Sequence, residues 1–237
     1  IRYCISKKGR FALMKEKKQF LASAQQSLSE LYDRVHSAPT LPLSALEPSR
    51  TALLVVDMVN GFVKEGPMSS PRVGALNKKL ASLCKACSDR GIKVLAFADT
   101  HSMDSPEFSA YPPHCLQGDW ESEVTEEISR SCVYTRISKN STNGFLEPEF
   151  RTWIQEHPQI DCFLVVGDCT DICIQQLALS LKAEFNRQNR PARVIVPASC
   201  CETFDLGLHD GDLMHLVALY SMGEGGVELV ADMEGLE

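Results

Sequence analysis

The sequence lacks the features of several classes of protein. No apolar stretch reaches the roughly 18–20 residues that a membrane-spanning helix needs, so we expect no membrane partner. Basic residues are outnumbered, with 24 Lys and Arg against 31 Asp and Glu and a net charge of -7. Without a basic stripe that could neutralise phosphates, we expect no nucleic acid partner either. A small molecule is the expected partner.

The motifs of two common enzyme types are also missing. No Gly-x-Ser-x-Gly elbow is present, which disfavours a Ser-His-Asp hydrolase. No Gly-rich turn follows the first predicted strand, which disfavours a dinucleotide site, and we expect no organic cofactor. The first residues lack the apolar core and small-residue cleavage site of a secretory leader, so we expect a cytoplasmic protein.

The ten cysteines do not follow the pattern of a disulfide scaffold. They are dispersed through a mid-sized chain, which fits a reducing compartment. Cys84 and Cys87 form a C-x-x-C motif within a predicted helix. No second pair completes a zinc site and no strand leads into the motif, as a redox site would require. We therefore interpret this pair as packing.

The chain divides into an N-terminal extension and one catalytic domain. Residues 1–18 are basic and weakly patterned, and we expect the natural start to lie nearer Met14. Apolar residues recur at helical spacing over residues 19–35, and the Pro-rich residues 37–48 follow. We therefore predict a helical extension and connector over 1–48, packed against the domain or a neighbouring subunit. The domain covers 49–237.

Strand-like apolar runs alternate with helical spacing over the rest of the chain. Strands buried on both faces and separated by helices imply a parallel sheet with right-handed crossovers. The predicted fold is α/β, a three-layer α-β-α arrangement around a largely parallel six-stranded sheet. The predicted strands cover residues 51–57, 93–98, 132–136, 162–166, 193–196 and 227–230, and the predicted helices cover 76–90, 121–129, 149–157, 171–189 and 210–220.

A candidate nucleophile, Cys173, lies at the start of one predicted helix. The preceding strand stops at Gly167, and Thr170 or Asp171 is a suitable N-cap. The sulfur would lie in the first helical turn, where free backbone N–H groups and the helix dipole favour a thiolate, so we expect a lowered pKa. The alternative is that Cys173 is a small buried hydrophobic residue like other cysteines.

Two charged residues accompany the ends of other predicted strands. Asp57 ends the first strand, and Lys139 follows the third. Ligands bind beyond the carboxyl ends of the strands in open parallel sheets, so Asp57, Lys139 and Cys173 are expected to converge there. Residues 202–205, after the fifth strand, could line the pocket rim, but packing is the simpler interpretation. His209, before Asp210 at a helix start, is interpreted as a capping charge.

A second group of residues predicts a metal site. Asp99 and His101 alternate in extended backbone, so their side chains point the same way, and Glu107 and His114 could return from the following loop. Two imidazoles and two carboxylates suit a divalent ion such as zinc, iron or manganese. A solvated loop with scattered His and Glu is the alternative.

Together these segments resemble the isochorismatase-like cysteine hydrolases, from about residue 51 to 230. The resemblance depends on residues 53–57 with Phe62, on Lys139 with residues 144–145, and on residues 167–173. Within that family, residues 99–101 and 111–115 resemble the nicotinamidases. The resemblance implies a cis peptide between Asp168 and Cys169. It also implies a family whose members commonly form oligomers, so we expect a homo-oligomer.

The resemblance also implies residue roles. Cys173 is the nucleophile, Asp57 the general base and acid, and Lys139 the cation beside both, expected to keep Asp57 ionised and to favour the thiolate. The backbone N–H groups of Cys169 and Cys173 form the oxyanion hole. The metal ligands are Asp99, His101, Glu107 and His114, with Asp104 as the competitor of Glu107, and Phe62 and Tyr111 flank the substrate ring unless they are core aromatics.

The expected reaction is the hydrolysis of nicotinamide to nicotinate and ammonia through a thioester. The metal ion would take the pyridine nitrogen of the substrate. Tyr111 stands where the family often has tryptophan, which leaves the ring substrate open. The alternative is a metal-free relative that acts on another small amide, a ureido compound or an enol ether. A non-catalytic protein that retains the fold is disfavoured because the triad is complete.

Overall fold

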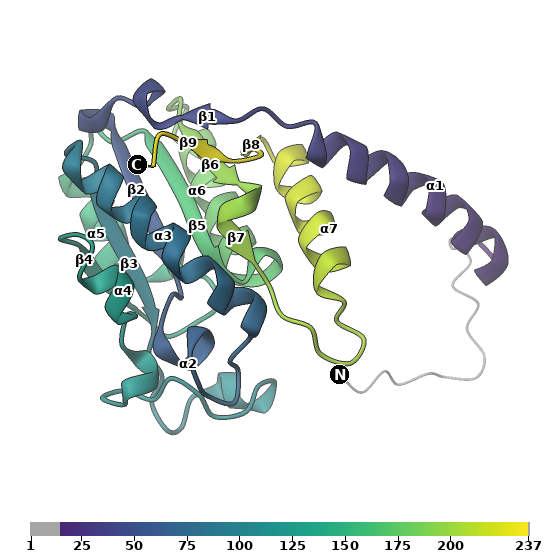
Figure 1. Cartoon of the computed structure of the whole chain (residues 1–237), viewed down its shortest axis with the longest axis horizontal. Coiled ribbons are helices and arrows are strands. Elements are labelled where there is room, and N and C mark those ends of the chain that lie inside the picture. The colour runs from purple at the N-terminus through teal and green to yellow at the C-terminus, as the bar shows by residue number, and fades with distance from the viewer. Residues whose placement is uncertain (1–14, 237) are drawn as a thin grey trace.

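The structure is a computed structural model that describes residues 15–236. Its centre is a parallel sheet with the strand order β4-β3-β2-β5-β6-β8, covered by helices on both faces (Figure 1). A short seventh strand, β7, pairs with β5. The strands are β2 (Thr51–Val56), β3 (Lys93–Asp99), β4 (Thr135–Lys139), β5 (Cys162–Asp168), β6 (Arg193–Pro197), β7 (Cys201–Glu202) and β8 (Glu228–Val230).

The predicted α/β fold with a largely parallel sheet is confirmed, with two corrections to the strands. The sheet has seven strands instead of six, because the two-residue β7 is too short to leave a pattern in the sequence. Strand β4 begins three residues later than predicted and includes Lys139. The apolar residue Val133 suggested an earlier start, but its side chain is 88% exposed.

The principal helices are α1 (Lys17–His36), α3 (Pro71–Asp89), α5 (Pro148–Glu156), α6 (Gln175–Arg187) and α7 (Gly211–Glu224), with short turns α2 (Asn60–Val63) and α4 (Glu126–Ser129). Helices α3, α5 and α6 bury apolar residues against the sheet, whereas α1 packs on α7. The predicted helix over 121–129 is wrong in part, because residues 120–122 form a separate 3₁₀ turn before α4. None of the helices among residues 15–236 is both long and apolar enough to cross a bilayer.

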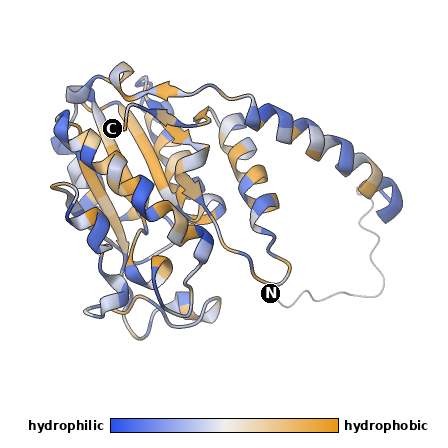
Figure 2. Cartoon of the chain, viewed as in Figure 1, coloured by the Kyte–Doolittle hydropathy of each residue, from blue (hydrophilic) through white to orange (hydrophobic). Residues whose placement is uncertain are grey.

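Two hydrophobic cores lie on opposite faces of the sheet. On one face, α3 packs Leu80 and Leu83 against strand residues such as Leu53. On the other, α5 and α6 pack residues such as Phe150 and Leu177. The strands carry apolar residues along their length (Figure 2), and every residue of β2 and β5 is buried. Because both faces are covered, the ends of the strands are the accessible part of the sheet.

The extension is attached at its C-terminal end. Helix α1 covers the predicted helix of residues 19–35, and the expected start near Met14 lies outside the described residues. Within α1, Val35 is buried, whereas Phe20 and Leu21 are 44% and 54% exposed. After α1, the strand β1 (Leu41–Pro42) pairs in parallel with β9 (Met233–Glu234). The boundary at residue 48 stays a prediction.

Candidate active site

The carboxyl ends of four neighbouring strands meet at one edge of the sheet. Asp57 follows β2, Asp99 and Lys139 are paired at the ends of β3 and β4, and Cys173 follows β5. Asp57, Lys139 and Cys173 are thus brought together, as the sequence predicts. All three are buried, with exposed fractions of 1%, 1% and 9%.

Lys139 is the centre of the cluster. Its Nζ lies 3.1 Å from Asp57 Oδ2 and donates to Asp99 Oδ1 at 2.6 Å. The same nitrogen lies 2.8 Å from the carbonyl oxygen of Ser141 and 3.8 Å from Cys173 Sγ. Burial opposes the charge of Lys139, but the two carboxylates raise its pKa well above the usual value. Lys139 is therefore a charged ammonium that compensates two buried acids.

Asp57 has the environment of a base that works near neutral pH. Burial raises its pKa to about 7, although Lys139 opposes this rise. Among residues 15–236, neither oxygen of its carboxylate has a partner in ordinary hydrogen-bond geometry. Lys139 favours the ionised form of Asp57, as the resemblance implies, but it does not cancel the effect of burial on the pKa. Asp57 can both accept and return a proton.

Cys173 is a protonated thiol in the resting site. Burial raises its pKa well above the usual value, and Lys139 only partly opposes this effect. The predicted lowering of the pKa is wrong. The prediction considered only the helix start, whereas burial of the sulfur has the larger effect. Ionisation of the thiol therefore requires a nearby acceptor, and Asp57 is the adjacent base.

The turn that carries Cys173 also differs from the prediction. Residues Thr170–Ile174 form a π-helical turn before α6, so the sulfur does not lie in the first turn of an α-helix. Thr170 and Asp171 do not cap the helix: Thr170 Oγ1 lies 2.9 Å from His215 Nδ1, and Asp171 binds other side chains. The peptide bond between Asp168 and Cys169 is cis, as the family resemblance implies.

Next to the thiol, four predicted metal ligands come together. One ligand atom each from Asp99, His101, Glu107 and His114 lies within 4.8 Å of the others. The Nε2 atoms of His101 and His114 lie 2.9 Å and 3.0 Å from the same oxygen, Asp99 Oδ2. Glu107 Oε1 lies 3.8 Å from His101 Nε2. Glu107 is thus the third loop member of the cluster, and Asp104 does not belong to it.

The contacts of the two imidazoles support a cation at this position. His114 Nδ1 lies 2.8 Å from the carbonyl oxygen of Pro112, which can only accept, so Nδ1 carries a proton. Nε2 of a neutral His114 then directs a lone pair at Asp99. His101 Nδ1 similarly contacts Asn140 Oδ1 at 3.0 Å. Partners that hold the other ring nitrogen are typical of metal-ligating histidines. The donor set therefore fits a divalent ion.

In the absence of an ion, protons would take its place. Burial opposes the charged form of both imidazoles, but hydrogen bonding to Asp99 raises the pKa of His101 and of His114. Burial also opposes charge on Asp99, yet Lys139 and the imidazoles hold its pKa well below the usual value. Asp99 is therefore ionised, and positive charge is favoured around it.

Aromatic side chains surround the entrance to the thiol. Phe62 and Tyr111 both line the pocket, and their ring centroids lie 5.6 Å and 6.3 Å from that of His114. Four further lining residues were not assigned to the site from the sequence. These are Met68, Thr142, Ile172 and Phe204. Interpreting residues 202–205 as packing is wrong for Phe204, although its position just after a predicted strand was a usable signal.

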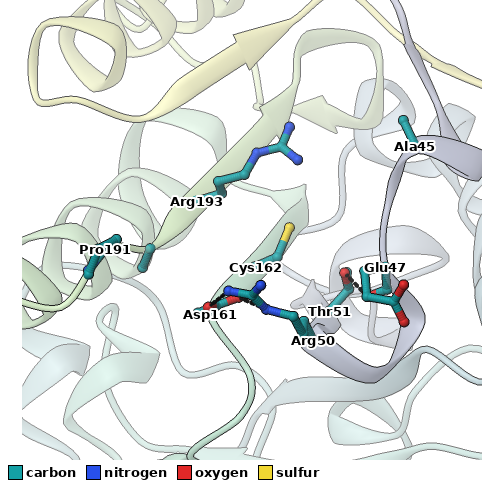
Figure 3. A pocket seen from close by; sticks show the side chains of 9 residues that line it. Ala45, Glu47, Arg50, Thr51, Asp161, Cys162, Pro191 and Arg193 are labelled. Carbon is teal, nitrogen blue, oxygen red and sulfur yellow. Dashed lines mark hydrogen bonds and ion pairs between the residues drawn. The ribbon is translucent and has the colours of Figure 1, made fainter.

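A second cavity lies at the opposite edge of the sheet, where β5 and β6 begin (Figure 3). Arg50 and Asp161 form an ion pair there, drawn as dashed lines in Figure 3. Cys162 lines this cavity, but burial raises the pKa of its thiol. No lysine lies among the described residues that line it. The carboxyl ends of the strands therefore differ from their amino ends in having a buried group of Lys, Asp and Cys.

Comparison with known proteins agrees with the geometry. The family model of the isochorismatase domain matches residues 51–223. This chain belongs to the isochorismatase family. The predicted family is confirmed, and so is the prediction that the chain is a hydrolase. The matched residues include Asp57, Lys139 and Cys173, while α1 and β1 precede the match.

Several members of the isochorismatase family resemble this chain. Nicotinamidase 1 of Arabidopsis thaliana is 34% identical over 220 residues, which cover 80% of this chain and 89% of the relative. A nicotinamidase–pyrazinamidase of Acinetobacter baumanii has a TM-score of 0.65 and 22% identity, covering 78% of this chain and 97% of that one. A Pyrococcus horikoshii pyrazinamidase in complex with zinc has a TM-score of 0.64 and 19% identity, covering 76% and 98%. These two structures support the fold.

Proposed function

We propose that this chain is an amidohydrolase that converts nicotinamide to nicotinate and ammonia through a thioester. One observation supports this most directly: Lys139 Nζ lies within 3.8 Å of both the Asp57 carboxylate and the Cys173 sulfur at one sheet edge. The identity to the Arabidopsis nicotinamidase supports the substrate. A base of pKa about 7 beside a protonated thiol suits acyl transfer at neutral pH.

The first half-reaction transfers the acyl group to sulfur. Asp57 accepts the thiol proton, and the Cys173 thiolate attacks the carboxamide carbon. The charge that develops on the amide oxygen is stabilised by the backbone N–H groups of Cys169 and Cys173, which we propose as the oxyanion hole. Asp57 then returns its proton to the leaving nitrogen, the C–N bond breaks, and ammonia departs. Lys139 compensates the buried negative charge throughout.

The second half-reaction regenerates the thiol. Asp57, now ionised, accepts a proton from a water molecule, and the hydroxide attacks the carbonyl carbon of the thioester. The C–S bond breaks, the proton held by Asp57 returns to Cys173, and nicotinic acid is released and loses its proton to water as nicotinate. One water is consumed, and one carboxylic acid and one ammonia are produced. Each proton transfer involves Asp57, so a carboxyl with a pKa near 7 is well suited to the reaction.

Asp99, His101, Glu107 and His114 would hold a divalent ion in this proposal. When bound, zinc, iron or manganese would act as a Lewis acid that anchors the ring nitrogen of the substrate. Phe62 and Tyr111 would lie against the ring and exclude water from it. The convergence of the four side chains and the zinc in the Pyrococcus structure support this assignment.

Ammonia release from nicotinamide tests the proposal. The purified chain should produce nicotinate and ammonia in equal amounts, and the Cys173→Ala variant should produce neither. Metal content, measured by elemental analysis, should be about one ion per chain and should fall in a His101→Ala variant. If the chain releases no ammonia and contains no ion, the metal-free alternative that acts on another small amide, a ureido compound or an enol ether would replace this proposal.

Self-association and a cytoplasmic location remain proposals. The family resemblance suggests an oligomer, and the expected small-molecule amide partner requires no membrane or nucleic acid. Sedimentation of the purified chain would decide the oligomeric state.

A further inference from the structure

One pocket residue is positioned by contacts that the proposed mechanism does not use. Phe204 lies after β7 and lines the pocket beside Ile172 and Cys173. It therefore adds an aromatic side chain to the pocket that holds Phe62 and Tyr111.

Phe204 is stacked on a histidine from its own loop. The ring centroids of Phe204 and His209 lie 4.0 Å apart, with planes inclined by 8°. A tight turn returns His209 over Phe204, with Leu206 and His209 exchanging backbone hydrogen bonds of 3.0 Å and 2.9 Å. Gly207, with φ of 60°, provides the left-handed residue of this turn. The ring of Phe204 is thus held between the pocket and His209.

His209 is in turn attached to the turn that carries the nucleophile. Its Nδ1 lies 2.8 Å from the carbonyl oxygen of Phe204, and its Nε2 lies 2.8 Å from Asp171 Oδ2. The two ring nitrogens thus join the Phe204 backbone to the Asp171 carboxylate. The other oxygen of Asp171 accepts from Thr203 Oγ1 at 2.7 Å. Interpreting His209 as a capping charge is therefore wrong, since Asp210 caps α7 without it.

We propose that Phe204 determines which ring the pocket accepts, and that Asp171 and His209 are positioning residues that hold Phe204 against the substrate. This inference rests on the proposed function, because it takes the substrate to be a flat heteroaromatic carboxamide. Asp171 lies two residues before Cys173, so one turn positions both the nucleophile and the ring of Phe204, which forms one wall of the pocket. A ring with a substituent toward Phe204 would be rejected, since a rigidly held wall cannot move aside.

The substrate range of Phe204 variants tests the proposal. For nicotinamide, Phe204→Ala should raise KM about tenfold and change kcat less than about threefold, because the wall binds the ring and performs no chemistry. Among the 2-, 4-, 5- and 6-methylnicotinamides, at least one should gain about tenfold or more in kcat/KM relative to nicotinamide. Phe204→Tyr retains the ring and should keep the nicotinamide KM. Unchanged KM and unchanged ratios in Phe204→Ala would overturn the proposal.

A double-mutant cycle tests the positioning role. His209→Gln should raise KM for nicotinamide without a matching loss of kcat, and adding it to Phe204→Ala should have little further effect. Additive effects of the two substitutions would show that His209 does not act through Phe204. His157→Gln is the matched control: His157 stacks on Trp153 at 4.2 Å and contacts its carbonyl oxygen at 2.8 Å, away from the pocket lining. It should leave both constants unchanged.

Failure of this inference is distinguishable from failure of the proposed function. If the unaltered chain hydrolyses none of these amides and its Cys173→Ala variant does not bind nicotinamide, both proposals are wrong. If turnover is intact and Phe204→Ala leaves every constant unchanged, this inference alone is wrong. Binding measured by calorimetry in the Cys173→Ala background, with and without Phe204→Ala, should show about a tenfold difference in Kd, which is independent of turnover.

Discussion

Replacing Asp57 by Asn should strongly reduce turnover and at the same time stabilise the fold. The amide has nearly the shape of the carboxyl, but it cannot accept the proton of the Cys173 thiol. Because the pKa of that thiol is raised by burial, few molecules would ionise without the base. We expect kcat/KM for nicotinamide to fall by about 10³-fold, within the range for loss of a general base.

The gain in stability follows from the same burial. The pKa of Asp57 is about 7 in the folded chain against an ordinary 3.8, so the ionised form costs up to roughly 4 kcal/mol of unfolding free energy at pH 7. A carboxyl whose pKa is raised on folding costs stability above its unfolded pKa. The cost falls as the pH approaches the unfolded pKa of 3.8, and below about pH 3 both states are protonated and it disappears. The stabilising effect of Asn should therefore be large at pH 7 and small at pH 4.

Paired measurements on two variants test this reasoning. Urea unfolding at pH 7 and pH 4 gives the free energies, and ammonia release gives the activity. Asp161→Asn is the control, since it makes the same chemical change in the cavity at the opposite edge, where Asp161 pairs with Arg50. It should retain full turnover and gain no stability. An Asp57→Asn variant that keeps turnover within tenfold, or unfolds more easily than the unaltered chain at pH 7, would refute the assignment of Asp57 as a buried base.

Further outcomes follow from the same geometry. With the unaltered chain, kcat/KM should decline below about pH 7 as Asp57 becomes protonated, and a flat profile down to pH 5 would contradict this. Lys139→Met leaves two buried carboxylates without a counter-ion, so urea unfolding should show a loss of about 3–5 kcal/mol; an unchanged midpoint would argue against the ion pairs. Gly167→Ala should prevent accumulation of folded protein, because a Cβ would lie 2.0 Å from the Val56 carbonyl oxygen and φ is 117°; a soluble variant with unchanged melting would contradict that contact.

Much of the fold could be predicted from local patterns. The central strands β2 and β5 are buried on every residue, so each leaves an uninterrupted apolar run in the sequence. The edge strand β4 was misplaced by three residues because its exposed and buried residues alternate, and the apolar Val133 precedes it. The two-residue strands β7 and β9 depend on tertiary pairing and have no local pattern.

The membership of the site was predictable, but its electrostatics was not. Asp57, Lys139 and Cys173 could be assigned to the site because each lies at or after the end of a predicted strand, which can be recognised in the sequence. Their protonation depends on how completely the carboxyl ends of the strands are covered, which the sequence does not reveal. Burial raises the pKa of Asp57 and of Cys173, and Lys139 opposes this effect. For Phe204 the sequence offered the pocket rim only as the less favoured alternative, because loop geometry, rather than any motif, places its ring in the pocket.

The pairing of β8 with β6 has a practical consequence for shortened forms of the protein. A fragment cut to the matched residues 51–223 would lose β8, together with β1 and β9. Strand β6 pairs with β8 along Ile195 to Pro197, so the cut would expose its backbone N–H and C=O groups to other molecules. Open edges of this kind recruit neighbouring chains. Trimming to the family boundary should therefore yield aggregates, because it removes the strand that covers the open side of β6.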